Sequence, residues 1–449
     1  MSKPFFGTDG IRGPVGVEPI TPQTIVHLGW ALGTVIKNHY GKGSVLVGKD
    51  TRVSGYLLES SMEAGLSSAG MDVVMLGPLP TPAIAYLTQT ARALAGVVIS
   101  ASHNHYSDNG IKFFSPGGAK ISDEIQDEIE ALMQESMKVV PSEQLGKAFR
   151  MDDAVGRYVE FCKGTIPRRM DLKGMKVALD CANGAAYQSA PAVFHELGAD
   201  IEVINNTPDG FNINNQCGST HIEGLQKLVL DKKCDVGIAF DGDADRVLMV
   251  DANGKVIDGD QLLFVIANSQ QQQGRLKGGV VGTLMSNFGM EKALSDRGIP
   301  FVRAKVGDRY VMQELKERDW VLGGESSGHI ICLDKTTTGD GLVSALQVLT
   351  QVQFMDKPLH ELADEMPLYP QTMINVKLPS GAVAADIVDM AEVKAAVKQV
   401  EDQLQDTGRV LLRPSGTEPV IRVMVEGQDS DQVEKCCKQI SETVSQLLA

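Results

Sequence analysis

The sequence predicts an α/β fold, in which three similar α/β units with mixed, mostly parallel sheets precede a smaller C-terminal α+β unit. A shared pattern, a helix that ends at a glycine followed at once by a β-rich run, occurs three times, at 68–77, 196–205 and 296–305. Another apolar strand lies one helix earlier in each case, within 43–50, 176–184 and 278–286. Strand–helix–strand units of this kind build mostly parallel sheets. One large doubly wound sheet would show the same periodicity.

The C-terminal segment has a different pattern. After about residue 370 come an extended run, an amphipathic helix near 390–405, two strands around a short loop and a final helix near 430–447, an order typical of a small α+β domain. A chain of 449 residues also exceeds a single core. We therefore predict four domains, with the bounds 1–155, 156–256, 257–369 and 370–449. The clearest soft segments are 269–279 and 378–385.

The amino-acid composition of the chain disfavours several classes of binding partner. The chain has 42 Lys and Arg against 57 Asp and Glu, a net charge of −15, and no basic patch, which disfavours nucleic acid and anionic membranes. It shows no secretion leader and no apolar run of about 18 residues, so we expect no membrane insertion and a cytoplasmic location. Seven cysteines without a C-x-x-C pair disfavour zinc and a disulfide framework.

A polar loop ends each of the three units, and the first follows the buried strand of "GVVISASHNHYSDNGIKFF" (96–114). Ser102 is the candidate nucleophile, because the adjacent His103 can act as acid or base and Lys112 can hold a cation over an anionic group. Ser100 is assigned to the end of the strand. A simple turn serine is the alternative for Ser102.

The second loop carries Asp241, Asp243 and Asp245 at alternate positions, directly after an apolar strand. Three carboxylates this close repel one another unless a cation lies among them, and oxygen ligands favour a hard ion such as Mg²⁺. An EF-hand is excluded, because Arg246 and Ala252 stand where it needs Gly and Glu. A solvated acidic turn is the alternative. Arg246 itself suits substrate phosphate or neutralises the acids.

The third loop, within 323–329, alternates Glu325, Ser327 and His329 among glycines, which suits hydrogen bonds to sugar hydroxyls. It also matches G-x-S-x-G around Ser326. That motif needs a helix after the serine, whereas the following "HIICL" predicts a strand, so a hydrolase elbow is disfavoured.

The loop of the C-terminal unit predicts an anion site, because arginine forks match phosphate and hydroxyls add donors. A plain hairpin turn is the alternative. The four loops together predict phosphoryl chemistry on a phosphorylated sugar, and no P-loop or dinucleotide motif supports a nucleotide enzyme. The candidate phosphate ligands are Arg413, Ser415, Gly416, Thr417 and Arg422.

With these loops in this order, the chain resembles a known family, the α-D-phosphohexomutases, and within it the branch that acts on glucosamine phosphates. The resemblance covers nearly the whole chain and implies four domains around a central cleft, three alike and one different. The motifs that carry it are "FGTDGIRG" (6–13), "SASHN" (100–104), "DGDADR" (241–246), "KVGDRYV" (305–311), "GGESSGH" (323–329) and "RPSGTEPVIRVMVEG" (413–427).

The resemblance also implies a reaction. Ser102 would carry a phosphoryl group and, with Asp241, Asp243 and Asp245, hold one Mg²⁺ per active site. The phosphoserine would convert glucosamine 6-phosphate into the 1,6-bisphosphate, which turns round, rephosphorylates Ser102 and leaves as glucosamine 1-phosphate for UDP-N-acetylglucosamine and the cell wall. Glucosamine or glucose 1,6-bisphosphate would be the activator. Roles in binding or proton transfer are implied for Thr8, Arg12, His103, Lys112, Arg246, Glu325, Ser327 and His329.

One residue departs from the family pattern, because His105 stands where the "SASHN" motif usually continues with proline. Loss of the fixed φ should loosen this loop. The alternatives in function are a phosphomannomutase or phosphoglucomutase of the same family, a sugar-phosphate phosphatase, a serine hydrolase built on Ser326, and a sensor that binds without turnover. A homodimer is the assembly considered, although the sequence does not decide it.

Overall fold

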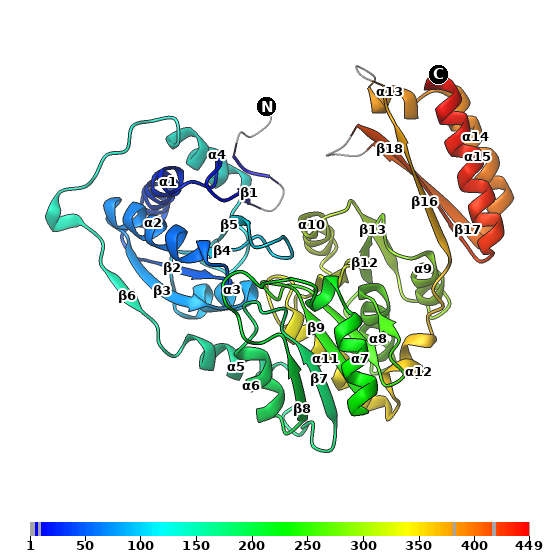
Figure 1. Ribbon diagram of the computed structural model, residues 1–449, viewed down its shortest axis with the longest axis horizontal. Coiled ribbons are helices and arrows are strands. Elements are labelled where there is room, and N and C mark those ends of the chain that lie inside the picture. Colours follow the sequence, from blue (N-terminus) through cyan, green and yellow to red (C-terminus); the bar gives the residue numbers. More distant parts are fainter. Residues whose placement is uncertain (1–4, 8–9, 380–382, 415–418, 449) are drawn as a thin grey trace.

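The computed structural model describes residues 5–7, 10–379, 383–414 and 419–448, and within these the strands form four sheets (Figure 1). The four units follow one another along an open arc, from the first unit at the left to the C-terminal unit at the upper right. Because each unit has its own sheet, the alternative of one large doubly wound sheet is wrong.

Each of the first three sheets contains a set of three parallel strands. Of these three strands, the one that comes first in the chain lies between the other two. The predicted repeat is therefore confirmed. The central strands and their two neighbours are β2 (Ser44–Lys49) with β3 (Asp72–Pro78) and β4 (Ala95–Ile99), β7 (Lys176–Asp180) with β8 (Asp200–Ile204) and β9 (Val236–Phe240), and β12 (Val280–Thr283) with β13 (Phe301–Ala304) and β14 (Leu322–Gly324).

An antiparallel strand follows the last of these parallel strands in every unit, and the hairpin between the two carries the polar loop. The first loop (100–107) joins β4 to β5 (Asp108–Phe114), the second (241–246) joins β9 to β10 (Val247–Asp251), and the third (325–329) joins β14 to β15 (Ile330–Cys332). The three loops therefore occupy equivalent positions in three copies of one architecture.

Three further strands lie at sheet edges, namely β1 (Ile11–Pro14) beside β5, β6 (Ala148–Arg150) beside β3, and β11 (Val256–Ile257) beside β10. In the β1–β5 pair Arg12 lies opposite Gly110. This pairing carries the opening motif of the chain to the strand that follows the first loop.

Helices cover the sheets, and the three predicted glycine caps are confirmed. After α2, α6 and α9 the chain passes through Gly70, Gly198 and Gly298 with φ of 92°, 92° and 65°, which glycine adopts readily. The helices of the first three units are α1 (Pro22–Tyr40), α2 (Ser54–Ser68), α3 (Thr81–Thr90), α4 (Asp123–Leu132), α5 (Ala154–Gly164), α6 (Ser189–Glu196), α7 (Glu223–Lys232), α8 (Gly259–Gln272), α9 (Phe288–Ser295), α10 (Asp308–Arg318), α11 (Gly341–Met355) and α12 (Leu359–Asp364).

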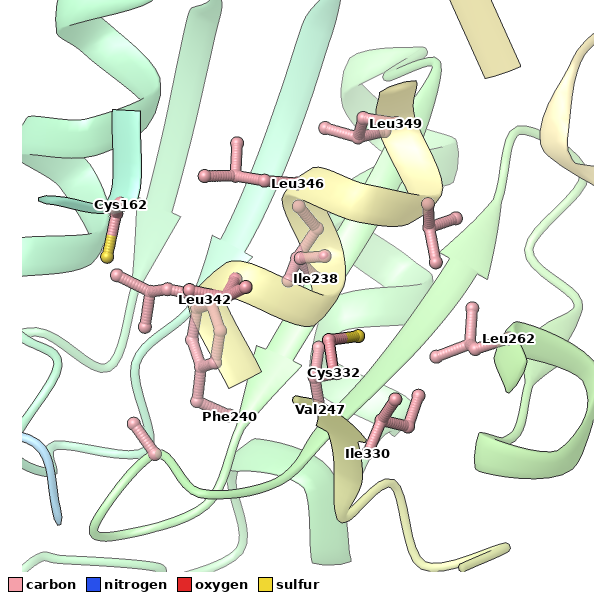
Figure 2. Close-up of a cluster of buried hydrophobic side chains, with 14 of the residues drawn as sticks. Cys162, Ile238, Phe240, Val247, Leu262, Ile330, Cys332, Leu342, Leu346 and Leu349 are labelled. Carbon is pink, nitrogen blue, oxygen red and sulfur yellow. The ribbon is translucent and has the colours of Figure 1, made fainter. Parts of the chain in front are cut away.

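One hydrophobic core runs continuously through the first three units. In Figure 2, Leu342 and Leu346 of α11 lie in the same cluster as Phe240 of the second sheet, Cys332 of the third sheet and Cys162 of α5. Burial of these side chains favours packing of the units against one another as one body. Separate cores are found as well, because the first unit buries a second cluster of its own and the C-terminal unit buries another.

The C-terminal unit has the predicted α+β architecture. Its antiparallel sheet has the order β16 (Gln371–Lys377), β18 (Val420–Gly427) and β17 (Gly408–Pro414). Its helices are α13 (Ala384–Val388), α14 (Ala391–Leu404) and α15 (Ser430–Leu448).

The glutamine-rich segment was wrongly predicted to be soft at its start, because α8 continues to Gln272. The hydroxyl of Ser269 and the amide of Gln273 both donate to the side-chain oxygen of Gln351 in α11, at 2.6 and 2.9 Å, and these contacts order the end of the helix. The second soft segment includes 380–382, which lies outside the described residues. The domain bounds expected after residues 155 and 256 fall within α5 and β11.

None of the helices in the described part of the chain combines the length and the apolar character that crossing a membrane requires.

Candidate active site

A cavity of about 200 Å³ lies where the loops of the first three units meet. Parallel sheets commonly gather their chemistry at the carboxyl ends of the strands, and three such ends converge here. The cavity is lined by Arg12, Ser102, Asp245, Arg246, Gly307, Asp308, Glu325 and His329. Residues that the sequence singled out in all three loops and in the opening motif therefore share one cavity.

Ser102 lies in the first loop and is only 1% exposed. Its backbone has a φ of 51°, a left-handed conformation that few residues other than glycine adopt. The hydroxyl donates a hydrogen bond to Oδ2 of Asp241 at 2.5 Å, and Nδ1 of His103 lies 3.4 Å away. The predicted nucleophile thus faces the predicted acidic loop.

Asp241, Asp243 and Asp245 are all buried in the second loop. One carboxylate oxygen from each lies within 4.8 Å of the other two. Because the three acids are removed from solvent, the alternative of a solvated acidic turn is wrong.

This acidic cluster fits a hard metal ion. Oδ1 of Asp243 and Oδ1 of Asp245 are buried, and neither has a hydrogen-bond partner among the described residues, an arrangement that is costly unless a cation compensates it. Nζ of Lys112 balances part of the charge, at 2.9 Å from Asp243 and 3.3 Å from Asp245. A set of carboxylate oxygens is the kind of site that Mg²⁺ prefers.

Crowding of charge moves the pKa values of two of the acids in opposite directions. Burial, followed by repulsion from Asp245 and Asp243, raises the pKa of Asp241 well above its usual value. Burial also acts to raise the pKa of Asp245, but Lys112 and His329 outweigh it and hold the pKa well below the usual value. Without a cation in the cluster, a proton is therefore best held on the acid that contacts Ser102.

Two histidines of the site differ in charge. Burial and then the guanidinium of Arg246 lower the pKa of His103 to about 4, so this ring is neutral at neutral pH. Burial acts in the same direction on His329, but the carboxylates of Asp245 and Asp308, each 3.6 Å from a ring nitrogen, raise its pKa to about 9. The floor of the cavity thus carries a cationic ring beside anionic side chains.

In the third loop, Glu325 and His329 line the cavity, whereas Ser327 is exposed and does not. Oε1 of Glu325 accepts the backbone N–H of Gly307 at 3.0 Å. Strand β15 follows Ser326, as predicted, so the helix that a hydrolase elbow requires is not there in the described chain.

The predicted phosphate residues of the C-terminal unit are only partly described. Arg413 and Arg422 lie directly opposite each other in the β17–β18 pair, where like charges destabilise a sheet unless an anion lies between them. Burial and the charge of Arg422 lower the pKa of Arg413. No described residue of this unit lines the 200 Å³ cavity. Thr8, Ser415, Gly416 and Thr417 lie outside the described residues.

Sequence reasoning missed several buried polar residues behind the loops. The hydroxyl of Thr81 donates to Oδ2 of Asp243 at 2.7 Å. Arg52 and Asn214 both donate to the carbonyl of Ser102, at 2.9 and 2.8 Å. A signal was present for two of them, because Arg52 and Thr81 closely follow the buried strands β2 and β3.

Comparison with protein families gives matches along almost the whole chain. The matching descriptions are all of phosphoglucomutase/phosphomannomutase: alpha/beta/alpha domain I for residues 3–139, alpha/beta/alpha domain II for 157–254, alpha/beta/alpha domain III for 258–369 and the C-terminal domain for 373–443.

Relatives and solved structures agree with these matches. Proteins named phosphoglucosamine mutase from Alcanivorax borkumensis and Hahella chejuensis are 57% and 56% identical, covering 100% and 99% of this chain and the same shares of their own. A phosphoglucomutase/phosphomannomutase family protein from Burkholderia thailandensis shares the fold with a TM-score of 0.82 at 24% identity, over 98% of this chain and 96% of that one. The Aspergillus fumigatus N-acetylphosphoglucosamine mutase, solved with GlcNAc-6P and magnesium, has a TM-score of 0.71 at 16% identity, and the match covers 100% of this chain and 97% of that one. The chain therefore belongs to the phosphoglucomutase/phosphomannomutase family, the α-D-phosphohexomutases.

Proposed function

We propose that this chain is a phosphoglucosamine mutase, an isomerase that interconverts glucosamine 6-phosphate and glucosamine 1-phosphate. The observation that carries the proposal is the hydrogen bond of 2.5 Å from the buried hydroxyl of Ser102 to Asp241, at a cavity shared with Arg246 and His329. The name of the full-length relatives supports glucosamine phosphates as the substrates.

Ser102 carries the phosphoryl group that is transferred. In the forward step the Ser102 O–P bond breaks and a bond forms between phosphorus and the 1-hydroxyl oxygen of the sugar, while the proton of that hydroxyl passes by way of a base to the serine oxygen, which is left as a hydroxyl. The neutral ring of His103, 3.4 Å from the serine oxygen, suits that base. Lys112 and Arg246 offset the negative charge of the phosphoryl group in the transition state.

Asp241, Asp243 and Asp245, with the phosphate on Ser102, would hold one Mg²⁺. Two buried carboxylate oxygens of Asp243 and Asp245, which have no hydrogen-bond partner in the described part of the chain, support this assignment. When bound, the ion supplies positive charge that stabilises the transferring phosphoryl group.

The bisphosphate produced in the first step turns round in the cavity and returns its 6-phosphate to Ser102, so the enzyme ends phosphorylated. Glucosamine 1,6-bisphosphate or glucose 1,6-bisphosphate supplies the first phosphate. Ring hydroxyls bind Glu325 and His329, which line the cavity, whereas the predicted ligand Ser327 lies outside it. Thr8 and Arg12 assist from the opening motif. The phosphate that does not react binds Arg413, Ser415, Gly416, Thr417 and Arg422. Release of glucosamine 1-phosphate toward UDP-N-acetylglucosamine, a homodimer and a cytoplasmic location remain predictions.

The test is an assay with glucosamine 6-phosphate, Mg²⁺ and trace glucose 1,6-bisphosphate, combined with peptide mass spectrometry. We expect glucosamine 1-phosphate as product and one phosphate on Ser102. Ser102→Ala should lower the rate by about three orders of magnitude or more, because the nucleophile is lost, whereas Ser326→Ala should keep it.

The other outcomes identify the alternatives. Free phosphate without the 1-phosphate product would indicate a phosphatase, and binding without turnover a sensor. Faster turnover of mannose or glucose 6-phosphate would indicate another mutase of the family. Loss of activity in Ser326→Ala with retention in Ser102→Ala would indicate a serine hydrolase.

A further inference from the structure

We propose that Arg52, together with Asn214, is a positioning residue that clamps the first loop so that the hydroxyl of Ser102 points at the acidic loop. The inference deepens the proposed function and, for its effect on phosphoryl transfer, rests on it. Neither residue lines the cavity, so both act through the backbone of the loop.

Arg52 follows strand β2 and is completely buried. Its Nε donates to Oδ2 of Asp50 at 2.8 Å, and its Nη2 donates to the carbonyls of Ser102 and Asn104, both at 2.9 Å. Its Nη1 donates to the carbonyl of His105. Burial of an arginine costs free energy unless its N–H donors are hydrogen-bonded. Here the planar guanidinium donates to the carboxylate of Asp50 and to three carbonyls of the first loop.

The opposite side of the loop is held through Asp50. The hydroxyl of Ser100 donates to Oδ2 of Asp50 at 2.6 Å, and the backbone N–H of Ser102 donates to the hydroxyl oxygen of Ser100 at 2.9 Å. The N–H and the carbonyl of Ser102 are therefore both fixed by one buried ion pair, Asp50 with Arg52.

Asn214 supplies the second half of the clamp from the second unit. Its amide nitrogen donates to the carbonyls of Ser102 and Asn104, at 2.8 and 3.2 Å. Gly242 of the acidic loop packs against the same place, because a Cβ at that position would meet both the Ser102 carbonyl and the Asn214 amide. The clamp therefore fixes the first loop relative to the acidic loop as well as within its own unit.

These contacts explain the unusual backbone of Ser102. A left-handed conformation at a serine persists only where the surroundings impose it, and the contacts to its N–H and carbonyl do so. None of the bonds from Arg52, Ser100 or Asn214 uses the Ser102 hydroxyl. The clamp can therefore hold the loop in the same way with and without a phosphate on Ser102. The bond to the carbonyl of His105 adds a constraint at the position where the family motif usually has proline.

Arg52→Lys tests the clamp, because lysine keeps the charge that balances Asp50 but cannot reach three carbonyls. We expect the KM for glucosamine 6-phosphate to stay within about 2-fold. Both kcat and the rate at which glucose 1,6-bisphosphate phosphorylates Ser102 should fall by about 100-fold, since small misplacement of a reacting group costs that much.

Asn214→Gly is the second variant, and it protects the test against misfolding of the first. Asn214 has a φ of 56°, which glycine adopts without strain, so this change removes only the amide. We expect a fall of about 10-fold in the phosphorylation rate. Arg297→Lys is the matched control, because Arg297 also donates to one carbonyl and one carboxylate, those of Ala293 and Glu365, on the outer side of the third unit.

Hydrogen exchange followed by mass spectrometry separates positioning from general destabilisation. We expect faster exchange of the amides in 100–106 in both variants, with β2 and β7 unchanged, and no such change in Arg297→Lys. Exchange in 100–106 at the wild-type rate, a uniform rise across the first unit, or phosphorylation of Ser102 at the wild-type rate in both variants would overturn the clamp. A further outcome separates the two proposals. If the wild type gains no phosphate on Ser102, but the amides of 100–106 exchange faster in the two variants, the proposed function fails. The stabilisation of the loop by Arg52 and Asn214 is then still supported.

Discussion

At the scale of single residues, the site depends on charges that are buried beside one another. Two carboxylate oxygens of the second loop have no hydrogen-bond partner among the described residues, and Lys112 and His329 compensate only part of the charge of the acids. Such an arrangement is stable only when further positive charge is supplied. Because Asp241 belongs to this cluster and also accepts the hydroxyl of Ser102, binding of a cation is coupled to the position of the nucleophile.

Asp243→Asn should raise the Mg²⁺ concentration required for half-maximal activity by about 10-fold or more, because one anionic ligand is lost. The measurement is a titration of the initial rate with Mg²⁺ after removal of metal by EDTA. Asp334→Asn is the control, since that acid is exposed and pairs with Lys335. An unchanged Mg²⁺ requirement in Asp243→Asn would contradict the metal assignment.

A second buried acid gives a prediction about pH. Burial, followed by repulsion from Asp258, raises the pKa of Asp260 to about 7, whereas an unfolded chain has the ordinary value near 3.8. Between these values the unfolded chain releases the proton while the folded chain keeps it, so stability falls as the pH rises from about 4 to 7.

Asp260→Asn should remove this dependence. Between pH 5 and pH 7.5, the free energy of unfolding should fall by about 2 kcal/mol more in the wild type than in the variant. Urea-induced unfolding at the two pH values measures the difference. Parallel pH profiles for the two proteins would show that Asp260 does not titrate in this range.

At the scale of elements, the loops are supported by the first residues of neighbouring helices. The N–H of Gly259 in α8 donates to the carbonyl of Ser326 at 3.0 Å, and the N–H of Gly341 in α11 donates to the carbonyl of Ala244 at 3.0 Å. Asp340 caps α11 and also accepts the hydroxyl of Tyr158 in α5, at 2.9 Å. The second and third loops are therefore each held by a helix that belongs to the third unit.

Gly259→Ala should raise the KM for glucosamine 6-phosphate by about 10-fold, because the added Cβ would overlap the carbonyl oxygen of Glu325 and displace the third loop. Steady-state kinetics measure the effect. Gly156→Ala in α5 is the control, since a Cβ there meets nothing within 4 Å. An unchanged KM would indicate that the third loop does not contact the sugar.

At the scale of the whole molecule, three units form one packed body and the C-terminal unit stands beside it (Figure 1). Arg409 joins the two parts, because its guanidinium donates to the carbonyls of Leu284 and Ser286 at 2.9 and 2.8 Å and pairs with the buried Glu426 at 2.7 Å.

Arg409→Gln should destabilise the C-terminal unit by about 3 kcal/mol, because Glu426 would lose the partner of its buried charge. We also expect a larger radius of gyration in small-angle X-ray scattering and a lower kcat. Arg318→Gln breaks a pair with Glu314 at the surface and a contact of the guanidinium with the ring of Trp320, and it should change stability by about 1 kcal/mol or less. Equal stability of the two variants would remove Arg409 as the joint between the units.

The candidate residues of the first three loops share one property, which is that they stand in a polar loop right after a buried strand. Ser102, Asp241 and His329 were found in this way because hydrophobic periodicity and local composition reveal both the strand and its end. Arg52 and Asn214 were missed because they contact the nucleophile loop from distant parts of the chain, 50 and 112 residues away. The position of Arg52 after a buried strand is a local signal, but the contacts of both residues with the loop depend on packing between distant segments, which local sequence does not reveal.

The amino-acid sequence by itself determined the repeated strand–helix–strand units, the α+β end of the chain and the residue types of each loop, because these follow from short-range patterns of apolar, glycine and charged residues. Only the tertiary structure decided that the three loops meet at one cavity, that the acids are buried, and that Arg52 and Asn214 grip the backbone of Ser102. Burial and long-range hydrogen bonds set the charge and orientation of these groups, and both arise only when distant segments pack together.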